Sequence, residues 1–273
     1  MTTEYSGSGD PKRSMQLLWG VPDRPRRGPK PRLTVDRIVG AAIEIADAEG
    51  LAGLSMRRVA ERLGVTAMSL YTYVPGKAEL IDVMLDTVHA PTAEPDGDRN
   101  DWRSRLAGLA RENYDRYRRH PWLLQVATSV PVLGPNLLAR YDRELTAVAG
   151  LGLTEVEMDL VVTLVADYVH GAVRGAVEAA QMPQRTGMTA EQWWQSYEPL
   201  LAQVFDPERY PMAARVGGAA GAEYDAPADP ARAFEFGLQR VLDGIEALVS
   251  TRAADPATRA GAPTGPAGPG PGS

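Results

Sequence analysis

The chain has 273 residues, of which 44% are hydrophobic, and its formal net charge of −6 argues against indiscriminate binding to nucleic acid. The length is sufficient for one large or two modest domains, and no apolar run approaches the roughly 20 residues that a membrane span needs. Because the chain contains no cysteine, disulfides and thiolate metal sites are excluded, and we expect a cytoplasmic protein that does not contact a membrane.

The first 32 residues are rich in Gly, Pro, Ser and Arg and show no sustained hydrophobic period, so we expect a flexible basic arm over 1–32. Positive charge is concentrated in PRRGPKPR, from Pro25 to Arg32, just before the first predicted helix. Such a segment can follow a DNA backbone or enter a minor groove, or it can be a solvated tail. The sequence leaves both interpretations open.

Residues 33–89 carry the pattern of a compact unit of three or four helices. Thr34 is placed to cap a first helix, whose apolar residues recur at helical spacing until Gly50 stops it. The last helix of the unit is predicted over 77–89, again with an apolar stripe that faces inward. We therefore expect these helices to share one small core.

Between these helices lies a helix-turn-helix pattern. Ser55 is a suitable N-cap for a short helix, and Gly64 supplies the left-handed conformation that ends it. Thr66 can cap a second short helix, and Leu70 fills the space between the two. The small residue Ala60 allows the helices to cross closely. In this motif the second helix enters the DNA major groove.

A linker rich in Pro, Asp and Gly follows over 90–100, and it leads to a second, larger domain that we place at 98–252. Its composition predicts a loop over 206–230, and a low-complexity Gly/Pro/Ala tail over 253–273 should be disordered. No segment shows strand alternation, so we expect an all-α fold. Helices are predicted from 101 to about 119, over 122–127, 134–150, 154–180 and 190–205, and from 230 to about 250.

Two stretches, EGLAGLSMRRVAERLGV and TAMSLYTYVPGKAELID, resemble the tetracycline-repressor (TetR) family of bacterial transcription regulators. The resemblance is most specific over 33–89, where LYTYVPGK is close to the family pattern, and the second domain resembles only the all-helical plan. The resemblance implies a homodimeric repressor that binds a palindromic, double-stranded operator. It also implies that a small-molecule effector releases the DNA.

Within this resemblance, the second helix of the motif and its neighbours supply the DNA contacts. Met68 can pack on a thymine methyl group, and Lys77 combines its ammonium with a helix N-terminus, which suits a phosphate. Alternatively, Tyr71 and Tyr73 are partly core and Arg57 is only solvated. The expected DNA-binding residues are Arg57, Thr66, Ala67, Met68, Ser69, Tyr71, Tyr73 and Lys77.

The second domain is expected to dimerise, because two half-sites require two recognition helices. Its long helix carries small residues four apart, which permits close packing, and with the last helix it could form a four-helix bundle across a two-fold axis. The alternative is an ordinary intramolecular core. The expected interface residues are Gly171, Gly175, Phe234, Val241 and Ile245.

The same long helix carries three polar side chains at positions i, i+3 and i+7, which place one polar face in an apolar stretch. An apolar pocket with a few polar groups is the usual form of a small-molecule site. The alternative is an exposed helix face with aromatic residues in the core. The expected ligand-binding residues are Asn113, Tyr117, Trp122, Asp167, His170, Arg174 and Trp193, with no metal or cofactor.

Two other classes remain as alternatives for the second domain. It could be an enzyme, but the sequence has no Walker loop, no G-x-S-x-G elbow and no H-E-x-x-H motif, so we expect no catalysis. It could also be a module that assembles with other proteins, and the absence of an internal cavity would favour that function.

Overall fold

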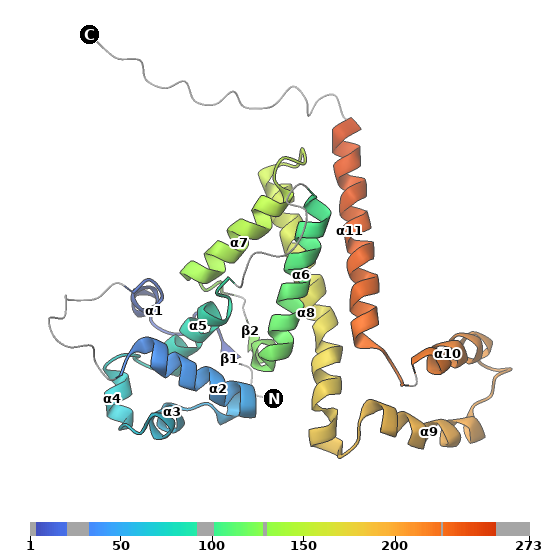
Figure 1. Ribbon diagram of the computed structural model, residues 1–273, viewed down its shortest axis with the longest axis horizontal. Helices are drawn as coiled ribbons and strands as arrows, with labels where there is room; N and C mark the ends of the chain where they lie inside the picture. Colours follow the sequence, from blue (N-terminus) through green and yellow to red (C-terminus); the bar gives the residue numbers. More distant parts are fainter. Residues whose placement is uncertain (1–3, 21–32, 92–100, 128–129, 225, 255–273) are drawn as a thin grey trace, which may run out of the picture.

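The computed structural model describes residues 4–20, 33–91, 101–127, 130–224 and 226–254. Within these ranges the chain is almost entirely helical, which confirms the predicted all-α fold (Figure 1). The basic segment from Pro25 to Arg32 lies outside the described residues, as do most of the predicted linker and nearly all of the predicted tail.

The predicted helix-turn-helix unit is present and begins where its caps require. Thr34, Ser55 and Thr66 each accept a backbone N–H at the start of a helix, and Gly64 ends the second helix in the left-handed conformation at φ 67°. Gly50 also has a positive φ, but it kinks the first helix instead of ending it. The helices are α2 (Val35–Gly53), α3 (Met56–Leu63), α4 (Ala67–Tyr71) and α5 (Lys77–Val88).

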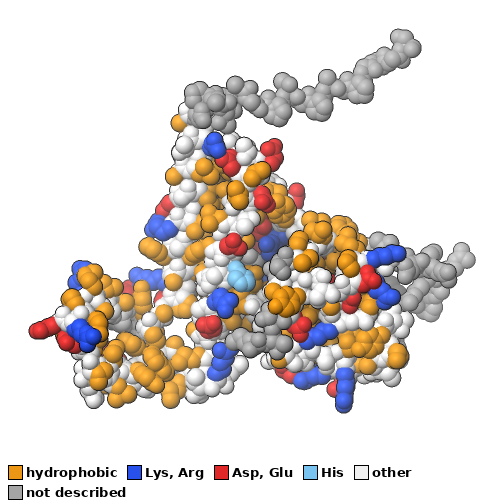
Figure 2. Space-filling model, turned by 180° about the vertical axis from the view of Figure 1, so that it is seen from behind, with side chains coloured by type: hydrophobic (Ala, Val, Ile, Leu, Met, Phe, Trp, Pro, Cys, Tyr) orange, Lys and Arg blue, Asp and Glu red, His pale blue; other side chains and the backbone are white. Residues whose placement is uncertain are grey.

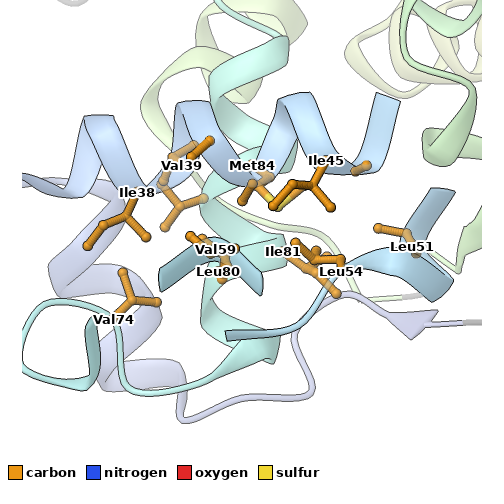
Figure 3. Packing of buried hydrophobic residues seen from close by; sticks show 14 of the residues in the cluster. Ile38, Val39, Ile45, Leu51, Leu54, Val59, Val74, Leu80, Ile81 and Met84 are labelled. Carbon is orange, nitrogen blue, oxygen red and sulfur yellow. The ribbon is translucent and has the colours of Figure 1, made fainter. Parts of the chain in front are cut away.

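One apolar core holds these helices together, as Figure 3 shows. The core side chains come mainly from α2, α3 and α5, and they are almost completely excluded from solvent. Burial of each such side chain contributes about 1.5–3 kcal/mol, so the core fixes the short α4 in place through its single buried residue, Leu70. The core side chains that point toward one another in Figure 3 include Ile38, Val39, Val59, Leu80 and Met84.

The second unit has its own core between α6, α8 and α11, and Figure 1 shows α11 running beside the other two helices. The predicted capping box is confirmed, because Thr154 and Glu157 each accept a backbone N–H from the other at the start of α8. The elements are α6 (Trp102–Arg119), the 3-10 helix η1 (Pro121–Gln125), α7 (Pro135–Val148), α8 (Glu155–Thr186) and α11 (Pro230–Ala254).

Helix α8 has 32 residues and a mean hydropathy of 1.3 over its most apolar window, so by length and composition it could cross a membrane. This does not contradict the prediction that no apolar run approaches about 20 residues, because Asp159, Asp167 and Arg174 interrupt the apolar sequence of α8. Six valines of α8 are buried between α6 and α11, so this face of the helix forms part of the protein core. One such helix is weak evidence for a membrane protein.

Residues 4–20, which the sequence assigns to a flexible arm, instead form a short strand and a helix. The strand β1 (Glu4–Tyr5) pairs in parallel with β2 (Val126–Ala127), and α1 (Pro11–Leu18) packs against α5. Asp10 caps α1 by accepting two backbone N–H groups. Both elements are too short to show a hydrophobic period, so their order comes from contacts with residues far away in the sequence.

The predicted loop over 206–230 also contains a helix, α10 (Pro211–Tyr224), which follows α9 (Ala190–Val204). Neither helix has a buried residue. Figure 1 shows both helices extending away from the end of α8, and Figure 2 shows apolar side chains gathered on the lower-left part of the surface, where these helices lie. Their contacts with the rest of the chain therefore leave most of their apolar side chains exposed to water.

Candidate nucleic-acid interface and ligand pocket

Helix α4 presents the side chains of its first turn to solvent. Leu70 is fully buried and anchors the helix, whereas Met68, two residues earlier, is 76% exposed, and Tyr71 is also exposed. Thr66 accepts the N–H of Ser69 and so fixes the start of the helix. The leading edge of α4 is therefore rigidly held and free to contact a partner, as a recognition helix must be.

The other expected DNA contacts lie around this edge. Arg57 of α3 is exposed, and its Nε lies 2.8 Å from Oε1 of Glu61 one turn later. An ion pair this exposed contributes little to stability, so the guanidinium can exchange its partner for a phosphate. Ala67 and Tyr73 pack partly against the core. The core alternative therefore holds in part for Tyr73, whereas Tyr71 is exposed.

Lys77, the first residue of α5, is engaged within the chain. Its Nζ lies 2.8 Å from Oε1 of Glu4 and donates a second hydrogen bond, 3.2 Å long, to the carbonyl oxygen of Leu51. The side chain is about two-thirds buried by these neighbours. Sequence reasoning could not find this partner, because Glu4 precedes Lys77 by 73 residues.

A cavity of about 530 Å³ lies between the two units, which is within the usual size of a small-molecule site. Its wall is formed by α5, α6, η1, α7 and α8 together with the segment that precedes α7. Within the described ranges, no three His, Asp or Glu side chains gather where they could hold a metal ion. The lining residues are Leu85, His89, Tyr117, Leu123, Pro131, Val132, Leu133, Leu137, Leu138, Arg140, Tyr141 and Asp159.

His89 is the buried polar group of this mostly apolar wall. Its Nδ1 lies 2.6 Å from the carbonyl oxygen of Leu85, and burial lowers the pKa of His89 to about 3. The ring is therefore neutral near pH 7, with its proton on Nδ1, so that Nε2 is left as an acceptor. Nearby, the hydroxyl of Tyr141 donates to Asp159 at 2.6 Å, and the guanidinium of Arg140 pairs with Glu144.

The low pKa of His89 predicts a loss of stability in acid. An unfolded histidine titrates near pH 6.5 and the folded one at about 3, so the unfolded state binds more protons between these values. Stability contributed by the neutral ring is present above about pH 6.5 and falls as the pH falls below it, by about 1.4 kcal/mol between about pH 7.5 and 5.5. Urea unfolding at fixed protein concentration measures this difference.

The comparison variant for this measurement is His89→Gln, which removes the titrating group. We expect the free energy of unfolding of the variant to fall by about 1.4 kcal/mol less than that of the natural protein over the same pH interval. An equal loss in both proteins would show that the burial of His89 does not carry the pH dependence. His170, whose pKa is also lowered by burial, is present in both proteins and cancels in the difference.

The structure separates the residues that the sequence assigned to the ligand site. Tyr117 lines the cavity, and His170 lies behind it, with Nδ1 3.3 Å from the tyrosine hydroxyl oxygen. Trp122, by contrast, is fully buried in the core of the first unit, where its Nε1 donates to Asp47 at 2.8 Å. Trp122 is therefore a core residue that joins η1 to α2.

The remaining candidates lie outside the cavity wall. Asn113 is buried and accepts a hydrogen bond from Arg116. Asp167 and Arg174 are on the exposed side of α8, which agrees with the alternative of a solvated helix face. Trp193 lies on α9 and stacks on Tyr197, with ring centroids 4.2 Å apart. Sequence spacing along one helix could not identify the residues that line the cavity, because these residues come from five elements and an intervening segment.

The expected dimer residues are also divided by the structure. Phe234 and Ile245 are 2% and 3% exposed and pack in the core of their own chain, so the assignment of Phe234 to the interface is wrong, whereas Ile245 also lines the groove between α8 and α11. Gly171 and Gly175 are exposed on α8, and Val241 is half-buried. The intramolecular alternative therefore holds for Phe234 and in part for Ile245.

An apolar groove of about 320 Å³ runs between α8 and α11. Its rim includes Leu160 and Leu164 of α8, which are 59% and 50% exposed. Exposed leucines beside a groove on two long helices are typical of a helix-bundle interface. The groove is lined by Glu157, Leu160, Val161, Leu164, Arg240, Val241, Gly244, Ile245 and Leu248.

Comparison with protein families gives two matches that together cover most of the chain. Residues 38–84 match the model described as bacterial regulatory proteins of the tetR family. Residues 94–249 match the model described as the tetracyclin repressor-like C-terminal domain. The two matches correspond to the helix-turn-helix unit and to the larger helical unit.

Individual relatives extend over nearly the whole chain. The HTH-type transcriptional repressor DrrR1 of Streptomyces coeruleorubidus is 48% identical over 254 residues, which are 92% of this chain and 91% of the relative. The crystal structure of ActR from Streptomyces coelicolor in complex with actinorhodin is similar, with a TM-score of 0.65 and 26% identity over 79% of this chain and 96% of that one. ActR in complex with (S)-DNPA has a TM-score of 0.62 and 26% identity over 80% and 98% of the two chains.

Proposed function

Because the chain belongs to the TetR family of bacterial regulatory proteins, we propose that it is a homodimeric transcriptional repressor that a small molecule releases from a palindromic operator. The observation that carries the proposal is the exposed first turn of α4, which the buried Leu70 holds rigidly. The repressor acts in the cytoplasm, and it neither catalyses a reaction nor needs a cofactor.

At the DNA, the first turn of α4 lies in the major groove. Met68 contacts a thymine methyl group, and Ser69 bonds a base edge or a phosphate. Thr66 and Ala67 direct the backbone N–H groups of the helix start toward the backbone of the DNA. Tyr71, Tyr73 and Lys77 contact phosphates around the groove, and these contacts position the helix without reading the sequence. Arg57 contacts a phosphate or a guanine.

Selection of bound duplexes from a random-sequence pool tests the DNA-binding proposal. We expect a palindrome whose half-sites are about 10 base pairs apart, or a multiple of this spacing, because the two recognition helices are related by two-fold symmetry. Recovery of no preferred sequence, or of a single unrepeated site, would contradict the proposal.

Two variants separate base reading from phosphate contact on the selected duplex. Met68→Ala should relax the preference at one position in each half-site by about 1 kcal/mol, because it removes an apolar contact with a base. Tyr71→Phe should weaken binding to all sequences alike, because it removes one phosphate contact. Fluorescence anisotropy on the selected duplex and on single-base variants measures both effects, and identical profiles for the two variants would contradict these roles.

The effector enters the cavity between the two units. A volume of about 530 Å³ and a wall rich in Leu, Val and Pro suit a largely apolar molecule. The acceptor nitrogen of His89 favours a hydroxyl or N–H on the ligand, and Arg140 favours a carbonyl or an anionic oxygen. The complex of the related ActR with actinorhodin supports a small molecule in this role.

Effector binding and DNA release are coupled because the cavity wall includes α5, which leads directly from the DNA-binding unit. An effector that prefers the DNA-incompetent arrangement by about 1–3 kcal/mol weakens operator binding by the same amount. A screen for compounds that release the selected duplex tests this step. A sensor returns its ligand unchanged, so turnover of a releasing compound would favour an enzyme. The cavity itself disfavours a domain used only for protein assembly.

A further inference from the structure

Residues 4–20, which we call the N-terminal strap, are fastened to the segment that forms part of the cavity wall. The backbone N–H of Ser6 donates to the carbonyl oxygen of Ala127 at 3.1 Å. The hydroxyl of Ser6 donates to the carbonyl oxygen of Val130 at 2.7 Å. At the other end of the strap, Nε1 of Trp19 donates to the carbonyl oxygen of Leu133 at 3.0 Å. Leu133 also lines the cavity. The strap therefore contacts the wall directly.

The strap also binds α5 through two buried carboxylates. Asp82 accepts the N–H of Gly7 and the hydroxyl of Ser14, both at 2.9 Å, and Glu79 accepts the N–H of Asp10 at 3.0 Å. These donors replace the water that the buried charges would otherwise need. If the strap leaves, water can reach both carboxylates again, so opening does not leave a buried charge without a partner.

The first strand of the strap reaches the start of α5, where Glu4 pairs with Lys77 at 2.8 Å. Each side chain retains about a third of its exposure, so solvent and other anions have access to the pair. A carboxylate and a phosphate would use the same ammonium at the same helix N-terminus. Lys77 therefore cannot give its full charge to DNA while Glu4 occupies it.

We propose that the N-terminal strap is an autoinhibitory element in which Glu4 competes with an operator phosphate for Lys77. This inference rests on the proposed function, which assigns Lys77 to a phosphate. Contacts that stabilise the closed strap weaken DNA binding, and DNA binding in turn loosens the strap. Because the strap is bonded to the cavity wall, a molecule that changes the wall changes the competition at Lys77.

The test uses the full-length chain and the duplex that the natural protein selects from random DNA. Glu4→Gln should bind this duplex about three- to tenfold more tightly, and the slope of log affinity against log salt should steepen by about 0.9, the value for one phosphate contact. Glu198→Gln, which removes the same charge from the exposed surface of α9, should leave both quantities unchanged. An equal gain in this control would overturn the proposal, because net charge alone would then explain it.

A second variant loosens the strap at two other positions, Ser6 and Trp19, and leaves both members of the ion pair in place. Ser6→Ala combined with Trp19→Phe removes the side-chain hydrogen bonds to the carbonyl oxygens of Ala127, Val130 and Leu133, of which Leu133 lines the cavity. We expect this variant to tighten DNA binding about two- to threefold. In the Glu4→Gln background these changes should add nothing, because both act through release of Lys77. Full additivity of the two effects would overturn the coupling.

The variant Lys77→Gln distinguishes failure of the autoinhibition proposal from failure of the assignment of Lys77 to a phosphate. If Lys77→Gln weakens binding but Glu4→Gln leaves it unchanged, the autoinhibitory role is wrong and the proposed function stands. If Lys77→Gln has no effect, the phosphate assignment fails and the strap proposal falls with it. When both single effects occur, Glu4→Gln should give no gain in the Lys77→Gln protein, and this result would support the competition.

Discussion

The variant Leu164→Asp is expected to be monomeric and to bind the selected operator at least about 100-fold more weakly than the natural protein. Leu164 lies on the rim of the groove between α8 and α11 and is half exposed in the single chain. In a dimer paired through this groove, the introduced carboxylate would be buried without a partner. The interface would therefore open, and the folded monomer would keep its own core.

The loss of operator affinity follows from the geometry of two half-sites. A dimer that has bound one half-site holds its second recognition helix near the other, at a high effective concentration. A monomer lacks this advantage, although each α4 remains intact. Sedimentation velocity measures the mass of the protein, and fluorescence anisotropy measures its operator affinity at the same concentration.

A matched control for this experiment is Val216→Asp, which places the same charge on an exposed apolar position of α10 outside the groove. We expect this variant to remain a dimer and to keep its operator affinity. A dimeric Leu164→Asp protein with normal affinity would place the interface elsewhere. A monomeric Val216→Asp protein would show that α10 takes part in it.

The second large effect is expected at Trp122, whose truncation to alanine should lower the free energy of unfolding by about 3–5 kcal/mol. The side chain is fully buried in the core of the first unit, and its Nε1 bonds Asp47. Trp122→Ala leaves a cavity and removes the donor from that carboxylate, although His120 still bonds the same oxygen. Chemical unfolding at fixed protein concentration measures the change.

Trp193→Ala is the matched control, because it removes the same side chain from α9, which has no buried residue. We expect it to cost less than about 1 kcal/mol, the value of one aromatic pair with Tyr197. Normal stability in Trp122→Ala together with a loss of effector response would restore the ligand role that the sequence assigned to this residue.

The sequence alone was sufficient for the helix-turn-helix unit. The caps at Ser55 and Thr66 and the left-handed Gly64 lie where the pattern predicts them, and the capping box at Thr154 is present as well. Each of these features depends on residues within about four positions along the chain, so local propensity decides it. The same locality explains why Met68 was correctly expected on the outer side of α4, opposite the buried Leu70.

The sequence could not identify the cavity or the order of the first residues. Of seven predicted ligand residues, Tyr117 alone lines the cavity, and His89 and Arg140 were missed because they belong to other helices. The strap was read as a flexible arm, because its order depends on Asp82, some 70 positions away.

The helix-turn-helix unit and the helix caps of this protein are thus determined by the sequence, because near neighbours along the chain form them, whereas α1 and α10 lie in segments for which the sequence predicted no helix. The partner of Lys77, the burial of Trp122 and the side of α8 that carries Leu164 were decided only by tertiary structure. A helical period shows that a face is apolar, but it does not show whether the chain's own core, a ligand or a second chain covers that face. The packing of distant segments settles this, and in this chain it placed Phe234 in the core and left Leu164 at the surface.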